Sequence, residues 1–276
     1  MKIPFALTLL ALTLSSGMCA YAQDDHHGGG ATLASQNAAL ANATEGKGYG
    51  PQAPRDLSVK GGSNLRVFTM APAAAKMNLC NIHFHKNAEH KGGEFTLPSD
   101  AGFKYTGKLT PAEATPLSAE VCSGEHGGLQ VGDTIELHYV HSTAQVTPGP
   151  TLNACLSEAD ANPQLRVEAQ VLVLVNDAKA ANFAELTELG EVNGYQQAKR
   201  IPKHMGKAIQ YAGSTTGPNY NEKGSPLQVS WSVRPKVLKV NAESVGAWCK
   251  ANVFKEGHAH GVRNLVSDDK LLAPIR

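Results

Sequence analysis

The chain has 276 residues, a formal net charge of +1 at pH 7 and 18% charged residues. Proteins that bind nucleic acid or anionic membranes carry a marked positive excess, so this balance points to neither partner. The length suits one large domain. Beyond the N-terminal leader, no segment is apolar over the length that a membrane-spanning helix requires, so no membrane insertion is expected.

The N-terminus has the three parts of a secretory signal peptide, which we assign to residues 1–22. Lys2 is the short positive region, residues 5–14 form the apolar core, and Ala20-Tyr21-Ala22 is a small-x-small cleavage site. We therefore predict a secreted protein, located in a bacterial periplasm.

Residues 23–46 are rich in Gly, Ala, Asn and His and show no periodicity, which indicates a flexible N-terminal segment. We predict that residues 47–276 form a single domain, because this part contains no internal repeat and no linker. Short strand-like runs separated by Gly, Pro and Asn dominate it. The predicted strands are residues 64–70, 78–85, 134–141, 165–175, 227–233 and 236–240.

Helical patterns are scarce in this domain. They cover residues 182–189 and 241–250, where Asn241 is placed to cap the second helix. Residues 167–175 are apolar on both faces and are predicted as a central strand. The expected fold is mainly β (α+β), a large sheet with a few short helices.

The first chemical motif lies in residues 81–90. Side chains alternate along a strand, so His83 and His85 share one face while Ile82 and Phe84 point to the other. Two imidazoles on one face supply half of a metal site.

A second strand supplies the other half. By the same alternation Glu136, His138 and Val140 share a face. If His138 lies beside His83 and His85, three neutral imidazoles can hold Zn²⁺ and leave its fourth position to water. Glu136 would then orient an imidazole through that ring's second nitrogen.

Two further histidine motifs have simpler interpretations. His141 faces away from His138 and is expected to be a hydrogen-bonded histidine of the core or of an interface. His258-Ala259-His260 repeats the His-x-His spacing, but Gly257 and Gly261 flank it, so a loop is expected.

Four cysteines follow the leader. An even number in an oxidising compartment favours one or two disulfides, and three complete pairings remain open. Cysteine ligation of the metal is the alternative, but strict alternation places Cys80 on the face opposite Asn81 and His83. The cysteines are Cys80, Cys122, Cys155 and Cys249.

The order of these motifs resembles that of α-class carbonic anhydrases. The matching segments are His83-Phe84-His85, Glu89-His90, residues 136–141, residues 211–218 and residues 229–233. Gly48-Tyr49-Gly50-Pro51-Gln52 and the run Cys80 to His90 look like the δ-class family. The resemblance implies an α-carbonic-anhydrase-like fold with a large twisted, mostly antiparallel central sheet and short peripheral helices.

The resemblance also implies roles for single residues. His83, His85 and His138 would be the zinc ligands, with Asn81 and Glu136 as their hydrogen-bond partners. Thr216 would orient the zinc-bound hydroxide and donate to the Glu89 carboxylate; a shift of one residue would give this role to Thr215. Val140, Val229 and Trp231 are candidates for the apolar wall beside the metal, where CO₂ would lie.

The implied enzyme is a carbonate dehydratase, a lyase that hydrates CO₂ reversibly to bicarbonate and a proton by attack of a zinc-bound hydroxide. One Zn²⁺ is expected per chain, with Co²⁺ or Cd²⁺ as substitutes. A homodimer is compatible with the sequence. No residue is assigned as the proton shuttle; the candidates by residue type are His90, His126, His204, His258 and His260.

Two alternatives use the same residues. A cupin-like metal-dependent oxygenase or isomerase would bind iron or manganese directly through Glu89, although Met77 and Thr96 replace the glycines that flank the cupin motif. An exported non-catalytic metal-binding protein would use the same imidazoles with the fourth position closed.

Overall fold

The computed structural model describes residues 35, 38–39, 42, 55–63, 68–124, 127–214, 227–262 and 269–275. The predicted signal peptide, nearly all of the N-terminal segment, Thr215, Thr216 and His126 lie outside these residues.

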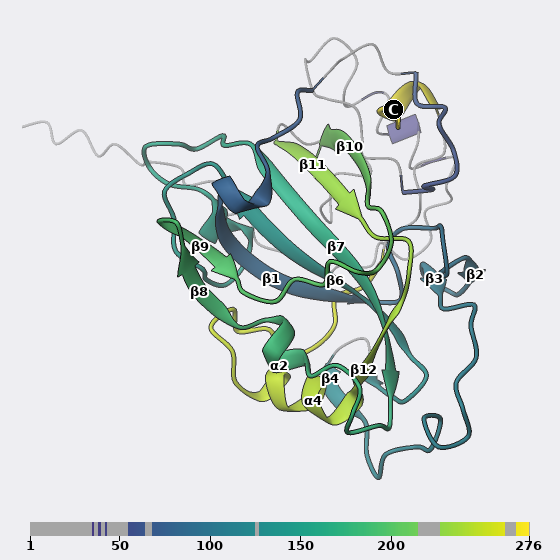
Figure 1. The fold of residues 1–276 in the computed structure, drawn as a ribbon. Coiled ribbons are helices and arrows are strands. Elements are labelled where there is room, and N and C mark those ends of the chain that lie inside the picture. The colour runs from purple at the N-terminus through teal and green to yellow at the C-terminus, as the bar shows by residue number, and fades with distance from the viewer. Residues whose placement is uncertain are drawn as a thin grey trace, which may run out of the picture.

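A twisted six-stranded mixed sheet forms the centre of the protein (Figure 1). Three pairs are antiparallel (β1 with β6, β6 with β7, β10 with β11), and β7 pairs in parallel with both β11 and β12. The mainly β fold and the mostly antiparallel sheet are therefore confirmed. The order is β1 (Asn78–Lys86), β6 (Thr134–Ser142), β7 (Leu165–Val175), β11 (Gln228–Val233) and β10 (Ile209–Ser214), with β12 (Leu238–Asn241) beside β7.

Smaller elements surround the sheet. The strand pairs are β2 (Leu97–Pro98) with β3 (Phe103–Lys104), β4 (Val121–Gly124) with β5 (Gly127–Leu129), and β8 (Leu189–Val192) with β9 (Tyr195–Ala198). The α-helices are α2 (Phe183–Leu186) and α4 (Ala242–Lys250); the 3₁₀ helices are η1 (Ala74–Lys76), η2 (Leu152–Cys155) and η3 (Asp269–Leu271).

Both predicted helices form, and asparagines cap them. The Asn241 side chain accepts a hydrogen bond from Ser244 N–H at 2.8 Å, and Asn182 caps α2 in the same way. α2 is shorter than predicted because β8 begins at Leu189. Residues 68–70 form no strand, so that part of the predicted strand 64–70 is wrong, and residues 64–67 lie outside the described residues.

Alternation along the strands divides the apolar side chains between two cores. α2 and α4 lie together on one side of the sheet (Figure 1). Ile82 and Phe84 belong to the core between the sheet and these helices, where the Phe84 ring lies 5.6 Å from Phe183 and 5.9 Å from Trp248. Val140 belongs to the core on the other side of the sheet. His83 and His85 consequently face away from α2 and α4.

A bulge in β1 corrects one expectation. The register with β6 shifts between Leu79 and Asn81, which breaks strict alternation. Cys80 therefore packs in the same core as Val140 instead of facing the opposite layer. It is bonded to Cys155 and so is not a metal ligand.

The four cysteines form two disulfides. Cys80 pairs with Cys155, and Cys122 pairs with Cys249 across 127 positions of sequence. The first ties β1 to η2, and the second ties β4 to the end of α4. Two disulfides indicate an oxidising compartment.

Removal of the Cys122–Cys249 bond is expected to destabilise the protein. Closing so long a loop restricts the unfolded chain, so the double variant Cys122→Ser/Cys249→Ser should lose about 2–5 kcal/mol of unfolding free energy. Urea denaturation under non-reducing conditions measures this. A midpoint equal to that of the wild type would show that the bond does not stabilise the fold.

Candidate metal centre

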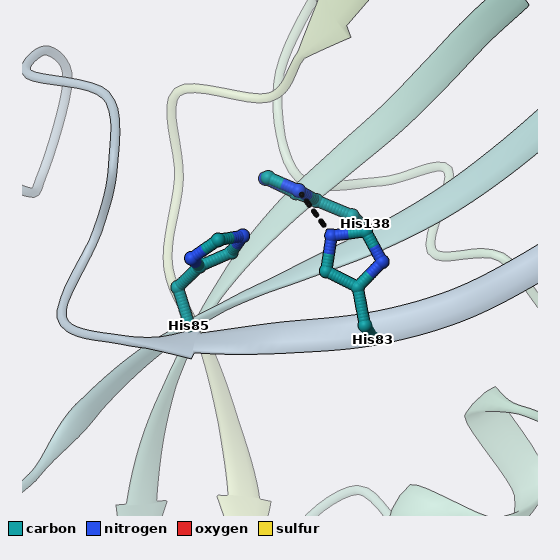
Figure 2. A group of neighbouring side chains, drawn as sticks. All are labelled: His83, His85 and His138. Atoms are coloured by element: carbon teal, nitrogen blue, oxygen red, sulfur yellow. Dashed lines mark hydrogen bonds between the residues drawn. The ribbon is translucent and has the colours of Figure 1, made fainter. Parts of the chain in front are cut away.

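The register of β1 against β6 brings the three predicted histidines together. His83 lies directly opposite His138, and His85 lies opposite Glu136, so His85 and His138 are diagonal neighbours. Figure 2 shows the three rings converging above the two strands. One ring nitrogen of each histidine lies within 4.8 Å of the others.

Hydrogen bonds fix which nitrogen of each ring remains available. The Nδ1–H of His83 donates to Asn81 Oδ1 at 2.7 Å, and the Nδ1–H of His85 donates to the Gly261 carbonyl at 3.0 Å. The Nε2–H of His138 donates to Glu136 Oε1 at 2.8 Å. The lone pairs therefore lie on Nε2 of His83, Nε2 of His85 and Nδ1 of His138.

The spacing of two of these nitrogens fits a small cation. His83 Nε2 and His138 Nδ1 are 3.3 Å apart, which is within hydrogen-bond distance (dashed line in Figure 2). The N–H group of each ring is committed elsewhere, however, so neither nitrogen has a proton to donate and two lone pairs face each other. Two nitrogens bound to one tetrahedral Zn²⁺ at 2.0–2.1 Å would be about 3.3–3.4 Å apart. A cation between them would turn this repulsion into attraction, so the donor set fits zinc.

The environment keeps His83 and His85 neutral, as metal ligation requires. Burial holds the pKa of His83 well below its usual value of 6.5, and the neighbouring imidazoles lower it further. Burial is also the main reason that the pKa of His85 falls to about 4, against the opposing effect of the Glu89 carboxylate. Both rings are therefore neutral at pH 7.

Glu136 lies at the centre of a buried hydrogen-bond chain. Besides His138, it accepts hydrogen bonds from His90 Nδ1–H at 2.6 Å and from the His90 backbone N–H at 2.9 Å. The Tyr211 hydroxyl donates to His90 Nε2 at 2.5 Å. Burial alone would raise the pKa of Glu136, but His90 and the donated hydrogen bonds hold it well below its usual value. Glu136 is therefore a carboxylate.

His90 belongs to this hydrogen-bond chain, which does not fit the proton-shuttle role for which it was a candidate by residue type. His90 is fully buried and both its ring nitrogens are bonded, so it does not reach solvent as a proton shuttle would. His90, Glu136 and His138 also form a second group of ligand-type atoms. Hydrogen bonds already join its members, so the other group, the trio of His83, His85 and His138, is the better candidate for a metal site.

Glu89 forms a buried ion pair that the sequence did not predict. Its Oε1 lies 2.9 Å from Arg55 Nε, and its Oε2 lies 3.5 Å from His85 Nε2. Burial raises the pKa of Glu89, but the Arg55 guanidinium and the nearby imidazoles outweigh this and lower it to about 2. An ionised carboxylate therefore lies beside the trio.

A fourth histidine, His260, also lies against the trio. Its ring centroid is 5.5 Å from His83 and 5.8 Å from His85, and its Nε2–H donates to Glu256 Oε2 at 2.7 Å. His258-Ala259-His260 does lie in a loop, as expected, but Ala259 and His260 are buried. The His-x-His spacing was the signal that could have marked His260.

The three predicted wall residues lie on the same side of the sheet as the trio. Val140, Val229 and Trp231 are buried in one core. The Trp231 ring lies 5.3 Å from His138 and 5.0 Å from His90. Its Nε1–H finds no acceptor among the described residues. Trp231 thus places an apolar surface against the His138 ring.

The remaining described histidines, His141, His204 and His258, differ in burial. His141 is a buried core histidine, with its Nδ1–H donating to the Tyr139 carbonyl at 3.1 Å, as predicted. His204 is exposed, and His258 is partly exposed with its ring 5.9 Å from His260.

The described part of the chain includes no helix long and apolar enough to cross a membrane.

A family model for the delta carbonic anhydrases matches residues 74–244, which include both histidine strands. No curated protein matches the chain.

Solved structures of carbonic anhydrases match at low similarity. One is a hyperthermostable carbonic anhydrase from an active hydrothermal vent chimney, with 14% identity, 80% of this chain and 86% of that chain covered, and a TM-score of 0.29. The α-carbonic anhydrase of Thermovibrio ammonificans has 12% identity, 84% and 89% coverage, and a TM-score of 0.27. A halotolerant carbonic anhydrase from Dunaliella salina has 13% identity, 88% and 97% coverage, and a TM-score of 0.31.

Proposed function

Since the chain belongs to the delta carbonic anhydrase family, we propose that it hydrates CO₂ reversibly to bicarbonate and a proton, with one Zn²⁺ held by His83, His85 and His138. One observation carries the proposal: three imidazoles converge, and each has its other nitrogen committed to a hydrogen bond. Among the described residues this group contains no fourth ligand, which leaves a coordination position for water.

Bound by three neutral ligands, zinc lowers the pKa of a coordinated water from about 15.7 to about 7 and so supplies a nucleophile at neutral pH. The protein's own part is to fix the donor atoms. Glu136 holds the Nε2–H of His138 and increases the basicity of that ring, and Asn81 does the same for His83. Neutral imidazole ligands leave the ion its full charge.

The substrate requires an apolar surface beside the proposed metal ligands. CO₂ forms few hydrogen bonds, so dispersion contacts must hold it close to the nucleophile. We assign this role to Val140, Val229 and Trp231; the contact of Trp231 with His138 supports it.

We assign orientation of the nucleophile to Thr216 and Glu89. As a carboxylate, Glu89 only accepts hydrogen bonds, so a hydroxyl that donates to it must use its oxygen to accept one from the nucleophile. Arg55 supports this role because it keeps Glu89 ionised.

Thr216→Ala is expected to lower kcat/KM for CO₂ hydration by about 10²-fold with little change in zinc content, because only the orientation of the nucleophile is lost. Thr215→Ala is the matched control and should stay close to wild type. Stopped-flow hydration with a pH indicator measures both. The opposite ranking would transfer the role to Thr215.

The function itself is tested on the purified wild-type protein. The preparation should contain one zinc per chain and hydrate CO₂, and a sulfonamide or azide should inhibit it. Chelation should abolish the activity and added zinc should restore it. A zinc-loaded protein without hydration activity would favour the non-catalytic metal-binding alternative, and direct Glu89 ligation of iron or manganese would favour the cupin-like one.

We also propose that residues 1–22 are removed on export and that the enzyme acts in a bacterial periplasm. The two disulfides support an oxidising location.

A further inference from the structure

We propose that Glu256 and His260 are positioning residues that hold the hydrogen-bond acceptor of His85 in place and thereby raise the affinity of the site for zinc. The proposal rests on the assignment of His85 as a ligand. It gives a role to a buried pair that lies far from the two histidine strands in sequence.

The backbone of His260 is attached to β1 on both sides of His85. Its N–H donates to the Phe84 carbonyl at 2.9 Å, and its carbonyl accepts from Lys86 N–H at 2.8 Å. The next residue, Gly261, supplies the carbonyl that accepts the Nδ1–H of His85. The position of this acceptor therefore depends directly on the position of His260.

The side chain of His260 adds a second attachment. Its Nε2–H donates to Glu256 Oε2 at 2.7 Å, and both residues are 7% exposed. A hydrogen bond to a carboxylate is stronger than one between neutral groups, and burial limits competition from water. The bond thus ties the loop that carries Gly261 to a fixed point.

The backbone around Glu256 is itself held by hydrogen bonds from the Asn252 side chain. Asn252 Oδ1 accepts the backbone N–H groups of Phe254 and Glu256, and its Nδ2 donates to the carbonyls of Trp248 and Glu256. The segment begins at the end of α4, where Cys249 is bonded to Cys122. Glu256 therefore stands on an anchored turn, and the His260 ring packs against His83 and His85 from there.

Glu256→Ala is expected to weaken zinc binding by about tenfold, at the lower end of the 10–100-fold range for loss of an outer hydrogen-bond partner, because Glu256 acts through one further residue. Glu256→Gln keeps a side-chain oxygen that accepts from His260, so it should restore most of the affinity. Competition with a chelating dye measures the dissociation constants. Lys250→Ala, an exposed change at the end of α4, is the control and should match wild type.

A nuclear magnetic resonance readout separates positioning from a general loss of structure. In the zinc-loaded Glu256→Ala protein, the Nδ1–H of His85 should exchange with solvent faster than in wild type. The Nδ1–H of His83 is held by Asn81 and should be unchanged. His260→Gln provides a second variant in case Glu256→Ala does not fold, and it should also accelerate exchange at His85.

Neither measurement depends on catalysis. A protein that binds zinc but does not hydrate CO₂ would refute the proposed function and leave this inference standing. Zinc affinity and His85 exchange that stay at wild-type values in folded Glu256→Ala or His260→Gln would overturn it. So would equal losses of affinity in Glu256→Ala and Glu256→Gln, because charge and not the hydrogen bond would then matter.

Discussion

Replacement of His138 by alanine is expected to abolish both stoichiometric zinc binding and CO₂ hydration. His138 supplies the donor from β6, and the trio retains two imidazoles from one strand without it. The loss of activity should exceed the 10–100-fold effect of removing an outer hydrogen-bond partner, because a ligand itself is removed. Metal analysis and stopped-flow hydration of the same sample measure both effects.

His141→Asn is the matched control for this variant. It removes another buried histidine from the same strand, and the asparagine amide can still donate where His141 Nδ1–H donates to the Tyr139 carbonyl. Zinc content and hydration should both persist. Full activity in His138→Ala would refute the assignment of ligands, whatever the behaviour of the control.

Glu136→Ala is expected to damage stability and metal binding together. Three N–H groups of His90 and His138 would lose their acceptor inside the protein. Removing one partner of such a buried charged network costs about 3–5 kcal/mol of unfolding free energy. Zinc affinity should fall by about 10–100-fold, because His138 loses the bond that fixes its tautomer.

The effect of Glu136→Ala on stability should depend on pH. The folded protein holds the pKa of Glu136 well below its usual value of 4.5, so the carboxylate stabilises the fold above pH 4.5 and loses this effect as the pH falls further. Urea denaturation at pH 7 and pH 4 measures the difference from wild type, which should be larger at pH 7. Glu168→Gln changes a partly exposed carboxylate on β7 and should leave the unfolding free energy nearly unchanged at both pH values. A Glu136→Ala variant as stable as the wild type at pH 7 would refute the stabilising role of this hydrogen-bond chain.

The trio could be predicted from sequence because it depends on local geometry. The two-residue period of a strand places His83 and His85 on one face, and the same period fixes His138 relative to Glu136. One pairing of β1 with β6 then suffices to complete the site. The apolar partners Ile82 and Phe84 confirm the period, since they pack in the core under α2 and α4.

The supporting residues could not be predicted because they come from distant segments without regular structure. Arg55 reaches Glu89, and Glu256 and His260 reach β1, through loops whose course depends on tertiary packing. The bulge that turns Cys80 toward the core of Val140 has no signature in the residue pattern. β10 was missed because Ala212 and Gly213 favour strands weakly, and pairing with β11 decides the outcome.

X-ray diffraction from crystals of the zinc-loaded protein, recorded at the zinc absorption edge, tests the central claim most directly. We predict one anomalous peak per chain, bonded to His83 Nε2, His85 Nε2 and His138 Nδ1, with a water as the fourth ligand. A peak bonded instead to His90 and Glu136, or a fourth position filled by a protein side chain such as Glu89, would contradict it.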